Sequence, residues 1–194
     1  TSGSLSGSGD VTVTKELSWT GGYMRGTGKT ILPAGATGTA TLSRTSDGLV
    51  RTLENHGELS LTGSQLYVLR NATETGVLAN TAGGVLTVDG ETDLRYFTGG
   101  ISNGPGQVTN AGTLRHTGSG TTTIAQPFEN DAGTIDTVAG SFRLEGNTTL
   151  GNTSLVGSDL VISAGELRVL PGANVTGGGF LRIHGDVRVN EDST

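Results

Sequence analysis

The fold of this chain is decided by a stretch that reads Leu53-Glu54-Asn55-His56-Gly57-Glu58-Leu59-Ser60-Leu61-Thr62-Gly63. An Asn, a Gly two or three residues later, and then apolar residues at alternate positions are typical of a turn that leads into a short, half-buried strand. Weaker copies of this pattern contain Asn80, Asn110 and Asn130. Because the pattern recurs, it predicts an architecture and not only one local element.

The four Asn residues are 25, 30 and 20 residues apart. Such spacing is typical of solenoids, in which each repeat buries its apolar face against its neighbours. We expect an all-β solenoid with about eight or nine coils and almost no helix, built as one domain over residues 1–194. Asn tolerates the left-handed region and Gly enters it freely, and stacked Asn amides can hydrogen-bond from coil to coil.

The composition agrees with a narrow core. Only 32% of the residues are hydrophobic and 4% are aromatic, which is thin for a compact domain of 194 residues. The 34 Gly residues do not indicate disorder, because the apolar residues are regularly spaced and the net charge is only -6. The absence of Cys excludes a disulfide scaffold and a Cys-based zinc site.

Charge and hydropathy exclude two classes of partner. The 18 acidic and 12 basic residues leave no basic excess for nucleic acid. No apolar run approaches the roughly 18 residues that span a bilayer, so we expect no membrane insertion by this segment.

Turn residues divide the predicted strands. Pro33 and Pro171 each follow an aliphatic strand and precede a Gly, and Pro cannot continue a hydrogen-bonded ladder. Residues 1–9 resemble the degenerate start of a coil, and residues 187–190 resemble an interrupted strand. Neither stretch contains an obvious cap. We therefore expect a fragment of a longer repetitive protein, with end-to-end self-association through uncapped ends as one mode of assembly.

Two stretches carry a family resemblance. Residues 19–36 contain a W-x-G-G, G-x-G and aliphatic-x-x-G-A pattern, and residues 51–59 read R-x-L-x-N-x-G-x-L. They resemble the repeats of large bacterial cell-surface and secreted proteins built on the right-handed parallel β-helix, including autotransporter passengers and filamentous-haemagglutinin-type adhesins. The resemblance implies a right-handed parallel β-helix, an extracellular or cell-surface location and a stalk or adhesive role. It implies no catalytic residue.

Two loop motifs fail as ligand sites. Gly26-Thr27-Gly28-Lys29-Thr30 has the end of a phosphate loop, but Tyr23 stands where the first Gly is required and a strand follows in place of a helix. Asp89-Gly90-Glu91-Thr92-Asp93 has oxygen donors at alternate positions, but Gly100 stands where a calcium-binding EF-hand loop needs Glu. We favour a strand for the first motif and a solvated turn for the second.

The histidines also show no catalytic pattern. His56, His116 and His184 are scattered singly, with no second His at metal-ligand spacing and no G-x-S-x-G nucleophile motif nearby. We expect each in a turn or on a strand surface. Accordingly we expect no catalytic residue, no metal, no cofactor and no enzyme activity.

A basic stripe is the main candidate for ligand binding. Its members each lie at the outward position between two inward apolar residues: Arg115, Arg143, Arg168, Arg182 and Arg188. Stacked on one face, several of them would meet an anionic polysaccharide. Glu145, Glu166 and Asp186 lie close enough to neutralise the stripe, which favours an ordinary solvated face.

The expected function is that of a non-enzymatic structural or adhesive segment of a large extracellular bacterial surface protein. The partners would be cell-surface glycans or other extracellular proteins. The exposed rings of Tyr23, Tyr67 and Tyr96 are possible platforms for sugars, whereas Trp19 is expected to pack in or against the coil. The alternative is a carbohydrate-binding or polysaccharide-degrading β-helix domain.

Overall fold

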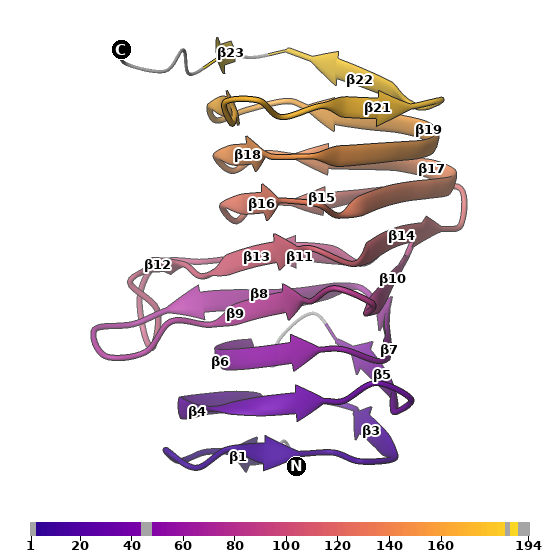
Figure 1. Cartoon of the computed structure of the whole chain (residues 1–194). Helices are drawn as coiled ribbons and strands as arrows, with labels where there is room; N and C mark the ends of the chain where they lie inside the picture. The colour runs from indigo at the N-terminus through magenta and orange to yellow at the C-terminus, as the bar shows by residue number, and fades with distance from the viewer. Residues whose placement is uncertain (1–2, 44–47, 185–186, 190–194) are drawn as a thin grey trace.

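The chain folds as a parallel β-solenoid of about eight turns (Figure 1). The computed structural model describes residues 3–43, 48–184 and 187–189. All 23 strands belong to one continuous sheet, and these residues form no helix, so none of them belongs to a helix able to cross a membrane. The predicted fold class is confirmed.

The strands stack in three ladders, named A, B and C in the order in which the chain meets them within a coil. Ladder A contains β1 (Ser4–Leu5), the start of β4 (Tyr23–Leu32), the start of β6 (Gly48–Asn55), β8 (Gln65–Arg70), β11 (Asp93–Arg95), β15 (Thr121–Ile124), the ends of β17 (Thr134–Leu144) and β19 (Thr153–Ile162), and β22 (Phe180–Ile183). Ladder B contains β2 (Val11–Thr12), the ends of β4 and β6, β9 (Val77–Asn80), β13 (Gln107–Asn110), β16 (Phe128–Asn130), β18 (Thr148–Leu150), β20 (Leu167–Val169) and β23 (Val187–Val189). Ladder C contains β3 (Glu16–Trp19), β5 (Thr37–Leu42), β7 (Glu58–Gly63), β10 (Val85–Asp89), β14 (Thr113–Thr117), the starts of β17 and β19, and β21 (Val175–Gly177).

Some strands are longer than expected. The sequence predicts strands of about three to five residues, but β4, β6, β17 and β19 contain 10, 8, 11 and 10 residues. Each of them turns a corner of the solenoid and contributes to two ladders. The corners of β4 and β17 contain a register shift, which local alternation of apolar residues does not reveal.

The core is a narrow bore filled by aligned aliphatic side chains. In ladder B, Leu53, Leu78, Val108 and Phe128 stack in register and are all buried. Trp19 is also buried, as predicted, and its Nε1 donates to the carbonyl oxygen of Gly21 at 3.2 Å. Burial in such a bore contributes about 1.5–3 kcal/mol per large aliphatic side chain.

A second inward column of ladder B consists of four buried asparagines, here called the asparagine ladder: Asn55, Asn80, Asn110 and Asn130. From Asn55 onward, each Nδ2 donates to the Oδ1 of the next Asn, at 2.8, 2.7 and 2.5 Å in turn. The Asn130 amide donates to Thr153 Oγ1 at 2.8 Å. The predicted stacking of Asn amides is therefore confirmed.

The same amides also satisfy backbone carbonyls of the following coil. The Nδ2 groups of Asn55, Asn80 and Asn110 donate to the carbonyl oxygens of Val85, Thr113 and Thr134 at 3.1, 3.0 and 3.2 Å. Since polar groups buried without a partner are costly, this pairing explains why Asn is tolerated in the bore. In the same column, Leu32 precedes the asparagine ladder and Leu150 follows it.

The expected left-handed glycine occurs in one of these turns, at Gly83, but three other glycines that follow the asparagines serve a different purpose. Gly57, Gly112 and Gly133 do not adopt the left-handed conformation; in these turns it occurs at Gly83 (φ 84°) and Ala132 (φ 61°). A Cβ atom at Gly112 would lie within 3.0 Å of the carbonyl oxygens of Thr81 and Gly84. Close approach between coils, and not backbone handedness, therefore requires Gly at this position.

One part of the solenoid departs from regular winding. The loops at residues 71–76 and 96–103 project from the side of the stack, at the left of Figure 1. There β12 (Gly104–Pro105) pairs with β8 antiparallel, whereas the other named pairs in the described residues are parallel. Gln126 is fully buried at the base of these loops and donates to the carbonyl oxygens of Val68 and Arg95.

Candidate functional site along the asparagine edge

The turns between ladders B and C form a continuous edge, here called the asparagine edge, which includes residues 33–36, 55–57, 80–84, 110–112, 130–133 and 150–152. Its inner side is the asparagine ladder. Its outer side carries the residue that follows each Asn, namely His56, Thr81, Ala111 and Asp131. The backbone hydrogen bonds from Thr81 N to Asn55 O and from Ala111 N to Asn80 O hold successive turns together.

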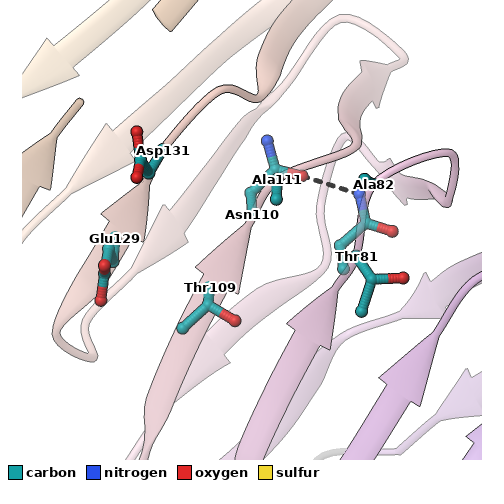
Figure 2. A pocket seen from close by; sticks show the side chains of 8 residues that line it. Thr81, Ala82, Thr109, Asn110, Ala111, Glu129 and Asp131 are labelled. Atoms are coloured by element: carbon teal, nitrogen blue, oxygen red, sulfur yellow. Dashed lines mark hydrogen bonds between the residues drawn. The ribbon is translucent and has the colours of Figure 1, made fainter. Parts of the chain in front are cut away.

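An open depression of about 230 Å³ lies on this edge (Figure 2). Hydroxyl groups of Thr81 and Thr109 and the carboxylates of Glu129 and Asp131 line it. Figure 2 also shows, as a dashed line, the hydrogen bond between the Asn80 and Asn110 side chains beneath the surface. The arrangement offers acceptors and hydroxyl groups to a polar ligand.

Two further depressions occur on the same edge. One is lined in part by Gly35, His56 and Gly83, and the other by Ala132, Asn152 and Asn174. The edge therefore presents several shallow notches along the stack. Fixed spacing of such notches follows from the rise of about 4.8 Å per coil.

A chain of polar side chains connects three successive coils at this edge. Thr81 Oγ1 lies 2.8 Å from His56 Nδ1, and His56 Nε2 lies 2.7 Å from Glu54 Oε1. The other oxygen of Glu54 accepts a hydrogen bond from Lys29 Nζ at 2.8 Å. The Lys29 contact, followed by the His56 contact, holds the pKa of Glu54 below its ordinary value.

The predicted basic stripe is divided among the three ladders. Arg115 lies in ladder C, Arg143 and Arg182 in ladder A, and Arg168 and Arg188 in ladder B. Arg168 and Arg188 are register neighbours, and Arg143 and Arg182 share a column with Val161 between them. The structure thus forms two pairs on different faces in place of one stripe.

Arg115 and Arg182 each contact a carboxylate of a neighbouring coil. Arg115 Nε donates to Asp136 at 2.9 Å, and Arg182 Nε lies 3.1 Å from Asp159. Arg143, Arg168 and Arg182 are exposed, and Arg115 is half-buried, as their outward positions predict. The side chain of Arg188 and the predicted neutralising residue Asp186 lie outside the described part of the structure.

The two rejected loop motifs have ordinary structural roles. Residues 26–30 lie within β4. In the acidic turn, Asp89 Oδ1 accepts from Gly90 N at 2.8 Å, and the Asp93 carboxylate accepts from Thr123 N at 2.7 Å and pairs with Arg95 at 3.0 Å. No group of three or more His, Asp or Glu residues suited to a metal ion occurs among the described residues.

His116 contradicts the expectation that every histidine lies in a turn or on a strand surface. It is completely buried in β14, and its ring packs edge-on against Phe142 with 5.1 Å between the ring centroids. Nδ1 donates to the Ala139 carbonyl oxygen at 2.6 Å, whereas Nε2 has no hydrogen-bond partner among the described residues. His116 points inward because it shares a column with Val88 and Thr137.

The environment of His116 predicts a pH effect on stability. Burial lowers the pKa of His116 below its ordinary value of 6.5, against the weaker opposing effects of the Ala139 hydrogen bond and the Asp89 charge. The neutral ring is therefore favoured in the folded state, and its contribution is present above pH 6.5 and is lost as the pH falls towards the lower folded-state pKa. Urea unfolding at several pH values should show a flatter decline below pH 6.5 for His116→Leu than for the unchanged chain. Equal declines in the two proteins would contradict this role.

The fold and the edge define the chain as a parallel β-solenoid with an internal asparagine ladder. No protein-family model, curated protein or solved structure matches this chain.

The contact between His56 and Thr81 is the feature that sequence reasoning missed. The two residues are 25 positions apart, and no catalytic motif contains that spacing. Alignment of the repeats on their asparagines reveals the pair, because Asn55-His56 and Asn80-Thr81 occupy the same place in successive coils. That alignment is the signal that finds it.

Proposed function

We propose that the chain is a non-enzymatic structural and adhesive segment of a large extracellular bacterial surface protein, acting as a rigid shaft. The observation that carries the proposal is the continuous ladder system, in which each coil is hydrogen-bonded to its neighbours on three faces. Solenoids of this kind are stabilised by contacts between adjacent repeats along one axis. An elongated rod suits the display of surfaces away from a cell.

The shaft would bind by multivalency. The notches of the asparagine edge and the arginines of ladders A and B recur at intervals set by the coil rise, so several weak contacts can act on one extended partner. Cell-surface glycans and other extracellular proteins are the partners that suit a shaft with shallow notches on one edge and exposed arginines on other faces. Self-association through the ends of the stack is a further prediction, which sedimentation over a range of concentrations tests.

Binding to an array of anionic glycans tests the adhesive proposal. We expect the double variant Arg143→Glu, Arg168→Glu to lose at least about tenfold in apparent affinity, because each change reverses the charge of an exposed outward side chain. The control is Lys15→Glu, which reverses the charge of one exposed side chain near the opposite end of the stack.

Two results would count against the shaft proposal. Equal binding by the double variant and by the Lys15→Glu control would remove the arginines from the interface. Depolymerisation of a polysaccharide by the purified chain would favour the alternative function, a carbohydrate-degrading solenoid. The acidic and hydroxyl-lined depression of Figure 2 is where substitutions would then be directed.

A further inference from the structure

We propose that Thr81 is a nucleophilic hydroxyl that accepts an acyl group from an activated acyl ester, with His56 as the general base and Glu54 as the residue that positions the base. The inference does not depend on the shaft function, because it concerns one covalent modification on the asparagine edge. A hydroxyl within hydrogen-bond distance of an imidazole that is itself oriented by a third group is the arrangement that activates a weak nucleophile.

The geometry sets the direction of the proton. Glu54 accepts hydrogen bonds from both Lys29 and His56, and these contacts, Lys29 first, lower the pKa of its carboxyl group. An ionised carboxylate can only accept, so in the neutral imidazole the proton lies on Nε2, 2.7 Å from Glu54 Oε1. The lone pair on Nδ1 is then left for the Thr81 hydroxyl at 2.8 Å.

A second contact fixes the nucleophile. Thr81 Oγ1 also lies 2.9 Å from the carbonyl oxygen of Asn55, and it donates to this oxygen when its proton is not directed to His56. Asn55 belongs to the buried asparagine ladder. The hydroxyl is therefore held by a rigid part of the fold, and positioning of this kind favours attack.

The surroundings of Thr81 admit a reagent and offer donors to a developing oxyanion. The His56 side chain is 38% exposed, and the next residues of the turn, Ala82 and Gly83, are exposed. Within the described residues, the backbone N–H groups of Ala82 and Gly83 donate no hydrogen bond. Free N–H groups beside a nucleophile are the donors that stabilise a tetrahedral oxyanion.

The reaction balances without a further reactant. Thr81 Oγ forms a bond to the acyl carbon while its proton moves to His56 Nδ1. Collapse of the tetrahedral adduct breaks the bond between the acyl carbon and the oxygen of the leaving group, which takes the proton from Nδ1. The products are O-acylated Thr81 and the free alcohol, and the carboxylate of Glu54 is unchanged.

The test uses p-nitrophenyl acetate and peptide mapping of the intact chain. Lys15 and Lys29 can also be acetylated, but their amides resist hydroxylamine, whereas an ester on Thr81 is cleaved. We expect a hydroxylamine-labile acetyl group on Thr81, formed at least about 100-fold more slowly in His56→Gln because general-base assistance is lost. Thr81→Ser should keep the reaction.

Further measurements distinguish activation of the Thr81 hydroxyl by His56 from simple exposure of a threonine hydroxyl. Thr109 lines the same edge without an imidazole hydrogen bond among the described residues, so it should not be acetylated. For Glu54→Gln, which retains a polar side chain but not the charge, we expect a rate loss of about tenfold with unchanged circular dichroism. Acetylation of Thr81 no faster than that of Thr109, or an unchanged Thr81 rate in folded His56→Gln, would overturn the proposal. Neither result would bear on glycan binding by the arginines.

Discussion

Replacing Asn80 with Leu is expected to lower the free energy of unfolding by about 3 kcal/mol, although Leu fits this column of the bore. Leu32 and Leu150 already occupy the positions that flank the asparagine ladder in the same column. The substitution removes the acceptor of the Asn55 amide and the donor to Asn110, and it leaves the Thr113 carbonyl without that donor. A buried polar group left without a partner costs about 1–3 kcal/mol, and only part of this is offset by the larger apolar side chain.

Urea denaturation followed by circular dichroism measures this effect. The matched control is Asn103→Leu, because Asn103 is exposed on the projecting loop; its change should be within about 0.5 kcal/mol. Asn80→Asp adds a sharper test, since a carboxylate has the same shape but cannot donate to Asn110 or Thr113. We expect Asn80→Asp to be at least as destabilising as Asn80→Leu at neutral pH. A ladder variant as stable as the Asn103 control would show that the amide stack does not hold the coils together.

Replacing Arg51 with Ala is expected to cost about 3 kcal/mol and to loosen the first two coils. Arg51 is only 1% exposed, and its Nη2 donates to the carbonyl oxygens of Gly9 and Lys29 at 3.0 and 2.6 Å. One side chain therefore joins three successive coils. Hydrogen bonds from a charged group contribute about 1.5–3 kcal/mol each, and truncation also leaves a cavity.

The Arg51 effect should be local as well as global. Hydrogen exchange should become faster for the amides of Val13 and Gly28, which bond between the first two coils, and should change less for Gly151 N, far along the stack. Arg70→Ala is the control, because Arg70 is exposed on the outer surface of β8. Equal stability of the Arg51 and Arg70 variants, with unchanged exchange at Val13, would contradict this account.

The repeated Asn and Gly positions predicted the fold because they report on contacts between neighbouring coils. Each Asn is 20 to 30 residues from the next and bonds directly to it. The outward direction of the Arg143, Arg168 and Arg182 side chains was also predicted, since alternate residues of a strand face opposite sides. Repeat spacing was sufficient for the fold, and local alternation for the outward direction of these arginines.

Alternation failed where the chain turns a corner or leaves the coil. Arg51 follows two buried residues, Leu49 and Val50, at the corner of β6, where strict period-two alternation ends. The loop at residues 96–103 interrupts the coil between β11 and β13, so the role of Gln126 beneath it could not be predicted from local alternation. The division of the arginines among three ladders was not readable, because alternation indicates which side of a strand a residue faces but not the ladder to which that strand belongs.

The most direct test of the stacked-coil account is a series of distances between paired spin labels on ladder C. The chain contains no Cys, so pairs of introduced cysteines can be labelled without background. Thr39 shares one outward column with Thr87, Asp136 and Val156, which lie two, four and five coils away. We predict label separations that increase by about 4.8 Å per coil, so that Thr39 and Val156 are roughly 24 Å apart. Separations that do not increase with coil number along this column would contradict the parallel solenoid and every inference built on it.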